Sequence, residues 1–157
     1  MSDHGPDAFG LLIDRYAARV FGFVSRTVRD RDDAEDIAQE VFVRAFQSPG
    51  RFDDRASYLT WLFKIATNLS VDRARKMGRG PAFVSFGNDA DSHRASAISD
   101  VHADPESRAI VGEMESAIKA AISGLSDKLR TTLLLHDLER QSYEEIAEIR
   151  EVPVGTV

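Results

Sequence analysis

The stretch Tyr58–Lys76, YLTWLFKIATNLSVDRARK, carries the pattern on which the expected fold depends. Ser57 precedes it and is a residue type that commonly caps the start of a helix. Apolar side chains recur in the stretch at steps of three and four residues, which predicts an amphipathic helix with one buried face. The members of this expected buried stripe are Tyr58, Leu62, Ile65, Ala66 and Leu69.

A second stripe of the same helix is polar and has the same helical spacing. It offers an amide, two cations and a carboxylate, which are groups that contact base edges and phosphates. Positive charge in the last turn suits the helix dipole and would also suit a phosphate backbone. An ordinary solvated face is the alternative interpretation. The stripe consists of Lys64, Asn68, Asp72 and Arg75, and Lys76 follows it.

Composition and charge narrow the class of protein. The 157 residues are 43% hydrophobic and include no cysteine, which excludes disulfides and thiolate metal sites. No apolar run is long enough to span a membrane, and the N-terminus lacks the pattern of a signal peptide, so we expect a cytoplasmic protein without membrane insertion. The net charge of −6 argues against a protein that simply coats nucleic acid. The four histidines are scattered, so we expect no catalytic site, no metal and no cofactor.

The order of patterns predicts an all-α protein. Helices are expected over Phe9–Val28, about Asp33–Gln47 and Tyr58–Lys76, which form a first domain over residues 1–77. Residues 78–105 are rich in Gly, Pro, Ser, Asp and Asn without a sustained period, which is typical of a flexible linker. Asp104 and Pro105 are residue types that begin helices, so a second helical domain is expected over 106–157.

The end of the chain predicts a helix-turn-helix. Ser142-Tyr-Glu-Glu145 has the spacing of a capping box and should open a short helix. A turn follows up to Gly155, with Glu151 where glycine is common, and Thr156-Val157 begins a further element. The expected domain is therefore truncated at its C-terminus.

Three motifs together resemble bacterial sigma factors of the sigma-70 family. DAEDIAQEVFVRAF (33–46), SYLTWLFKIATN (57–68) and DRARK (72–76) resemble their region 2, and SYEEIAEI with VPVGTV (142–157) resembles their region 4. Their order and the linker between them are similar to the extracytoplasmic-function group, which has only these two domains. The resemblance implies two small helical domains joined by a flexible linker, the second of them a helix-turn-helix domain.

The resemblance also implies an activity and partners. Such a protein is an alternative sigma factor, which binds RNA polymerase core and directs promoter recognition and transcription initiation. Docking on the clamp helices of the largest polymerase subunit would use Asp36, Gln39, Glu40 and Arg44. Acidic residues at the start of that helix would also simply favour the helix dipole. An anti-sigma factor is a further expected partner, and the response is expected to be to stress.

Promoter DNA would be held by the polar stripe of Tyr58–Lys76 and by the loop before it. Asn68 matches a position that contacts a base, and Lys64, Arg75 and Lys76 match positions near phosphates. Three other expected DNA contacts are Phe52, Trp61 and Thr156. Phe52 either lines a base pocket or anchors its loop, and Trp61 either wedges into DNA or packs in a core. Two alternatives remain: a helix-turn-helix regulator that acts without polymerase, and a sigma-like decoy that binds a regulatory protein.

Overall fold

The computed structural model describes residues 6–28, 30–48, 57–78 and 105–157. All regular structure in these segments is helical, which confirms the expected all-α class. The elements are α1 (Pro6–Ser25), α2 (Arg31–Gln47), α3 (Tyr58–Lys76), α4 (Pro105–Ser123), α5 (Asp127–Leu133), a π-helical turn η3 (Leu134–Leu138), α6 (Tyr143–Arg150) and a 3-10 turn η4 (Val154–Thr156).

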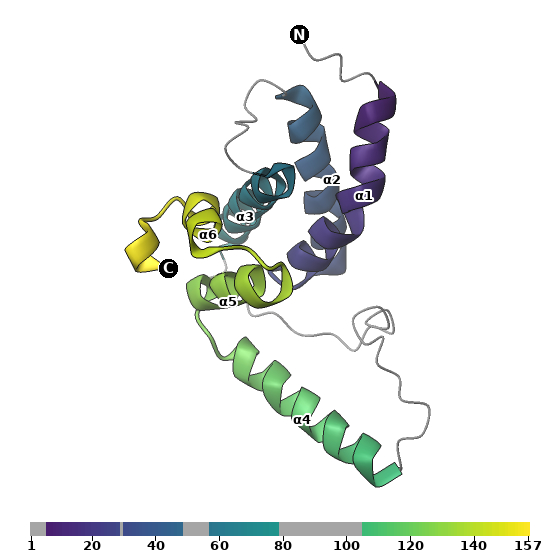
Figure 1. Cartoon of the computed structure of the whole chain (residues 1–157), viewed down its shortest axis with the longest axis vertical. Helices are drawn as coiled ribbons and strands as arrows, with labels where there is room; N and C mark the ends of the chain where they lie inside the picture. Colours follow the sequence, from purple (N-terminus) through teal and green to yellow (C-terminus); the bar gives the residue numbers. More distant parts are fainter. Residues whose placement is uncertain (1–5, 29, 49–56, 79–104) are drawn as a thin grey trace. The chain divides into compact units, whose positions relative to one another are not determined.

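The first three helices pack against one another around a common core (Figure 1). Phe23 of α1 and Phe63 of α3 are buried, and their ring centroids lie 5.0 Å apart. Phe9 of α1 and Phe46 of α2 form a second ring contact at 4.9 Å. Packing of apolar faces, rather than local propensity, is what holds helices of this length in water.

Helices α2 and α3 each begin at a short polar side chain that accepts a hydrogen bond from the first turn. Ser57 caps α3 as expected, because its Oγ accepts a hydrogen bond from the backbone N of Thr60 at 3.1 Å. Asp30 does the same for α2 through the backbone N of Asp32 at 3.1 Å. Helix α2 therefore begins about two residues earlier than the expected start near Asp33, because Asp30 supplies the cap.

The buried face of α3 is wider than the predicted stripe. Leu62, Ala66 and Leu69 are buried as expected, whereas Tyr58 and Ile65 are only partly buried and pack at the edge of the core. The prediction missed two buried apolar residues, Leu59 and Phe63. The reason is tertiary: α1, α2 and α6 all contact α3, so three neighbours cover more of its circumference than one would.

One compact unit contains α1, α2, α3, α5, η3 and α6, and α4 belongs to another. Within the first unit, α6 packs against α3 (Figure 1), and Leu134, Leu135, Ile146 and Ile149 join the same buried cluster as the first three helices. This contact was not expected. The domain limits proposed at 77 and 106 stay predictions, since residues 79–104 lie outside the described segments.

The start and the end of α6 differ in how well the sequence suits them. The predicted capping box is confirmed: Ser142 Oγ accepts from the backbone N of Glu145 at 3.2 Å, and Glu145 Oε2 accepts from the backbone N of Ser142 at 2.8 Å. The helix ends at Glu151, which has a left-handed conformation with φ of 54°. Glycine adopts this conformation with less strain, so the chain keeps a glutamate at some cost.

Helix α4 begins at Pro105, the predicted first helical position. Its apolar residues keep the predicted helical spacing, but four of the large ones are exposed in this structure. They are Ile110, Val111, Met114 and Ile118. No helix in the described segments is long and apolar enough to cross a membrane.

We predict that Leu62→Ala lowers the free energy of unfolding by about 2–5 kcal/mol, because it leaves a cavity in the shared core. Leu62 is 0% exposed. The matched control is Leu11→Ala, the same chemical change at a side chain that is 70% exposed, which should cost less than about 0.5 kcal/mol. Urea unfolding followed by circular dichroism measures both, and equal losses would contradict the packing described here.

Candidate nucleic-acid interface

The polar stripe of α3 is largely open to solvent. Asn68, Asp72, Arg75 and Lys76 are all exposed. They follow one another at helical spacing, away from the buried residues Leu62, Ala66 and Leu69. The structure therefore leaves four of the predicted DNA contacts accessible on one helix.

Lys64 is the exception within the stripe. Its side chain is 31% exposed, and its Nζ lies 3.5 Å from Oε1 of Glu151, in the turn after α6. The predicted phosphate contact is thus engaged by a carboxylate of the same chain. The distance is long for an ion pair and the glutamate is well exposed, so the pair contributes little to stability by itself.

The predicted aromatic contacts have different outcomes. Trp61 is partly buried against the core, and its ring centroid lies 5.5 Å from that of Tyr58. This packing accounts for the tryptophan without any role on DNA, and a DNA contact by Trp61 stays a prediction. Phe52 lies outside the described residues. Thr156 is exposed at the end of η4.

Tyr58 begins α3 beside a second tyrosine, Tyr16, with ring centroids 6.0 Å apart. Burial raises the pKa of the Tyr58 hydroxyl above its ordinary value, and the neighbouring Tyr16 raises it further. Because its pKa is raised, the Tyr58 hydroxyl stays protonated and uncharged through the physiological pH range. This end of α3 therefore gains no negative charge that would repel a phosphate.

Arg73 has a structural contact that the sequence interpretation missed. Its Nη1 lies 2.8 Å from Oδ1 of Asp33, and its Nη2 lies 3.8 Å from Oδ2 of Asp36. The two aspartates stand one helical turn apart on α2, so a single guanidinium joins the end of α3 to the start of α2. The acidic first turn of α2 thus has a partner besides its own helix dipole. The signal in the sequence was the Asp33–Asp36 spacing, but nothing local indicated which cation would meet it.

The predicted polymerase-docking residues lie on α2. Asp36, Gln39 and Arg44 are exposed and Glu40 is partly exposed. Arg44 Nε donates to Oε1 of Glu40 at 2.8 Å, an i,i+4 pair that holds both side chains along the helix. Two large apolar side chains of α2 are also exposed and were not predicted, namely Val43 (47%) and Phe46 (57%). A surface that mixes exposed apolar groups with charges is typical of protein–protein contacts.

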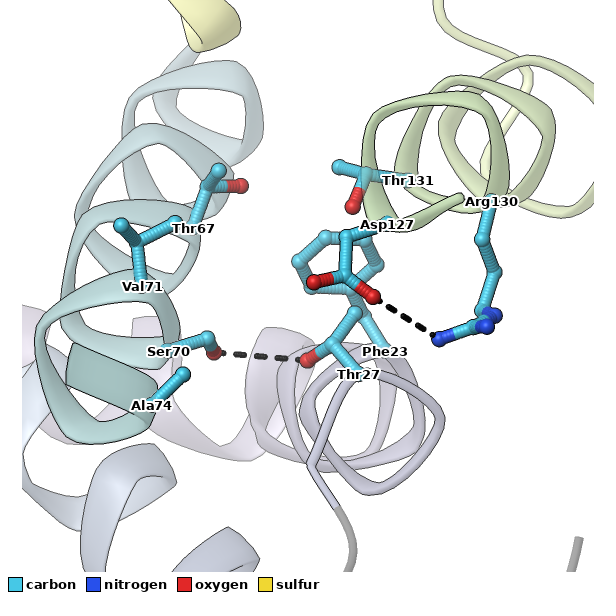
Figure 2. Close-up of a pocket in the computed structure, with 9 residues that line it drawn as sticks. All are labelled: Phe23, Thr27, Thr67, Ser70, Val71, Ala74, Asp127, Arg130 and Thr131. Carbon is cyan, nitrogen blue, oxygen red and sulfur yellow. Dashed lines mark hydrogen bonds and ion pairs between the residues drawn. The ribbon is translucent and has the colours of Figure 1, made fainter. Parts of the chain in front are cut away.

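A small pocket lies where α3, α5 and the end of α1 meet (Figure 2). Thr67, Ser70, Val71 and Ala74 of α3 line one side of it, and Asp127, Arg130 and Thr131 of α5 line another. Phe23 and Thr27 complete the lining, and the Thr27 and Ser70 hydroxyl oxygens are 3.3 Å apart. Thr67 Oγ1 is buried and has no hydrogen-bond partner. Buried hydroxyls without a partner are uncommon in folded proteins.

Within the described segments, no group of three or more His, Asp or Glu side chains is placed to hold a metal ion. The exposed side chains of α3 offer hydrogen-bond donors and acceptors together with positive charge. The exposed side chains of α2 form a mixed apolar and charged surface.

Comparison with known proteins identifies matches to two family models. Residues 12–80 match sigma-70 region 2, and residues 115–157 match sigma-70 region 4. The chain is 36% identical over 154 residues to the ECF RNA polymerase sigma factor SigW of Bacillus subtilis, covering 96% of this chain and 81% of the relative. It is 35% identical over 152 residues to the RNA polymerase sigma-H factor of Pseudomonas aeruginosa, covering 96% and 78% respectively.

Two solved structures have the same fold at 20% sequence identity. One is the sigma factor RpoE of Bartonella quintana in complex with the anti-sigma factor NepR, with a TM-score of 0.65, covering 95% of this chain and 86% of that one. The other is CnrH in complex with the cytosolic domain of CnrY, with a TM-score of 0.63, covering 97% and 79%.

We predict that Asp33→Asn lowers the free energy of unfolding by about 1 kcal/mol, because it removes the closer partner of Arg73 and a charge near the helix start. Asp36→Asn, on the same helix, should cost less than about 0.5 kcal/mol. The Asp33 side chain is 17% exposed and that of Asp36 is 67% exposed. Urea unfolding at low and high salt measures both changes, and an equal loss at the two positions would show that Arg73 does not distinguish them.

Proposed function

The chain belongs to the extracytoplasmic-function sigma factors of the sigma-70 family, which bind RNA polymerase core and direct transcription initiation, and we propose different roles for two of its helices. Helix α2 docks on polymerase, and the polar stripe of α3 binds the minus-ten element of the promoter. The observation that carries the proposal is that α3 is buried along one face while its amide and basic residues stay exposed along another.

The DNA contacts follow from the chemistry of the exposed stripe. The Asn68 amide both donates and accepts, so it can pair with the edge of an unstacked base. Arg75 and Lys76 bring positive charge to the end of the helix and neutralise phosphates. Asp72 lies between Asn68 and Arg75 in sequence and can accept a hydrogen bond from a base amino group. Flipping a base costs a few kcal/mol, which these contacts offset only when acting together.

The polymerase contact is proposed for the exposed side of α2. Gln39, Glu40 and Arg44 form its polar part, and the Glu40–Arg44 pair holds two of them in place. Val43 and Phe46 provide apolar area beside them. We propose docking on the clamp helices of the largest subunit. Asp36 contributes less than the others, because its carboxylate is also near Arg73.

The protein is proposed to act through polymerase, in the cytoplasm, and to catalyse no reaction itself. Control by an anti-sigma factor is also proposed. Support comes from the two structural neighbours: one is a sigma factor in complex with an anti-sigma factor, and the other is CnrH in complex with the cytosolic domain of CnrY. The exposed apolar side chains of α4, such as Ile110 and Met114, supply further surface for such a partner.

We predict that Asn68→Ala weakens open-complex formation by about 1–3 kcal/mol, the range for one good base contact, and leaves binding to polymerase core unchanged. Fluorescence anisotropy with labelled core measures binding to polymerase. Promoter opening by the holoenzyme, followed with a fluorescent base analogue at the minus-ten element, measures open-complex formation.

The matched control is Gln39→Ala, since both substitutions remove an exposed amide from a helix of the same unit. Gln39→Ala should weaken core binding and leave promoter opening normal once core is saturated. If Asn68→Ala and Gln39→Ala lose both activities equally, the division between the helices is wrong. If the unmodified chain fails to bind core, the polymerase proposal itself is wrong, and a decoy that binds a regulatory protein becomes the better explanation.

A further inference from the structure

The C-terminal end of α3 extends beyond the buried core. The last buried residue of the helix is Ser70, and every residue from 71 to 78 is at least partly exposed. A helix end without buried side chains opens at a low free-energy cost, because tertiary packing provides most of the stability of a helix. This end nevertheless carries three of the proposed DNA contacts, which therefore need a support other than the core. They are Asp72, Arg75 and Lys76.

Arg73 supplies such a support, because its guanidinium reaches from this end of α3 to α2. Its Nη1 lies 2.8 Å from Oδ1 of Asp33, and its Nη2 lies 3.8 Å from Oδ2 of Asp36. The Asp33 side chain is only 17% exposed, so its contact with Arg73 is screened less than an ion pair on the open surface. A guanidinium presents its donors in a rigid planar fork, so the contact fixes a direction as well as a distance.

The carboxylates that hold Arg73 belong to the helix that is proposed to dock on polymerase. Asp33 and Asp36 lie one turn apart in α2, and Gln39 follows at the next helical step. One side chain thus joins the proposed polymerase surface to the DNA-binding end of α3. With two carboxylates in reach, Arg73 can keep Asp33 while a basic group of polymerase takes the exposed Asp36.

We propose that Arg73 is a positioning residue for promoter binding: its ion pairs with Asp33 and Asp36 hold the C-terminal end of α3 in the orientation in which its exposed side chains reach the minus-ten element. This inference rests on the proposed functions of α2 and α3. Arg73 acts through its neighbours in the helix, not by contacting DNA. A site already held in its binding geometry loses less conformational entropy when the ligand binds, so a contact that adds little to the stability of the domain still raises affinity.

The variant Asp33→Asn tests the proposal, because the competing explanations predict a change of opposite sign. The substitution removes a negative charge from the neighbourhood of a DNA-binding surface, so general electrostatics would strengthen DNA binding. If Arg73 contacted a phosphate directly, loss of its closer carboxylate would free the guanidinium and also strengthen binding. Positioning predicts that forked DNA binds about fivefold more weakly, the effect of losing one partly buried ion pair.

The matched control is Asp32→Asn, the same change one residue earlier in the acidic first turn of α2. Both substitutions remove a charge that favours the start of the helix. Of the two aspartates, Asp33 is the one that lies 2.8 Å from Arg73, whereas Asp32 is exposed. Asp32→Asn should therefore leave the affinity for DNA unchanged or slightly higher.

Two separate affinities are measured for each variant of the full chain. Fluorescence anisotropy with labelled RNA polymerase core gives the affinity for polymerase. Anisotropy of a fluorescent forked DNA, with the variant saturated by core, gives the affinity of the holoenzyme for DNA; this DNA is selected from a randomised pool by the unmodified chain on core. A variant that was merely less stable would lose both affinities. For Asp33→Asn we expect polymerase binding to stay within about twofold, as for substitutions outside a contact.

A double-mutant cycle assigns the effect to the pair. Arg73→Gln and the double variant Arg73→Gln with Asp33→Asn are compared with Asp33→Asn on the same forked DNA. The double variant should bind no more weakly than Arg73→Gln, because removing one partner already breaks the contact. Arg73→Lys should recover part of the affinity that Arg73→Gln loses, since an ammonium group still pairs with Asp33 but lacks the planar fork.

Three results would each overturn the inference. Unchanged or stronger DNA binding by Asp33→Asn would show that Arg73 does not act through Asp33. Additive losses in the cycle would show that the two residues act independently. Equal losses of polymerase and DNA affinity would show a role in folding alone. In all three cases the unmodified chain still binds core and forked DNA, so the proposed function stands. If the unmodified chain on core selects no DNA, the proposed function fails, and the inference fails with it.

Discussion

The structure depends on the burial of α3 by three other helices at once. Leu62, Phe63 and Ala66 are fully buried, and α1, α2 and α6 each contact the helix that carries them. Removing three apolar side chains from water supplies several kcal/mol, which is comparable to the whole stability of a small domain. The same burial holds the polar stripe of α3 in a defined orientation, so the site has a rigid support rather than a loop.

Helix geometry sets which functional residues stay free. Successive residues turn by about 100° around the axis, so a helix covered on several sides has only a narrow exposed arc. Asn68 and Asp72 lie in that arc, whereas Lys64, one turn earlier than Asn68, lies at its margin and meets Glu151 of the turn after α6. Any competition between packing and DNA binding therefore falls on Lys64 rather than on the whole stripe.

Local patterns predicted what local chemistry determines. Ser57 as a cap, the capping box at Ser142 and Glu145, and most of the core stripe of α3 follow from spacing within one helix. Contacts between distant segments did not follow, because periodicity records which face is apolar and not which helix covers it. The Arg73–Asp33 pair and the docking of α6 on α3 belong to this second class, as does the burial of Leu59 and Phe63.

The contact between α3 and the residues Glu139–Glu151 combines two kinds of interaction with different consequences. Ile146 and Ile149 are 0% exposed and supply the favourable burial. The polar bonds of Thr60, Gln141 and Glu139 add little net free energy, because each replaces hydrogen bonds to water, but leaving any one of them unpaired in the interior is costly. Such bonds therefore select one register of the contact, whereas the two buried isoleucines supply most of its stability.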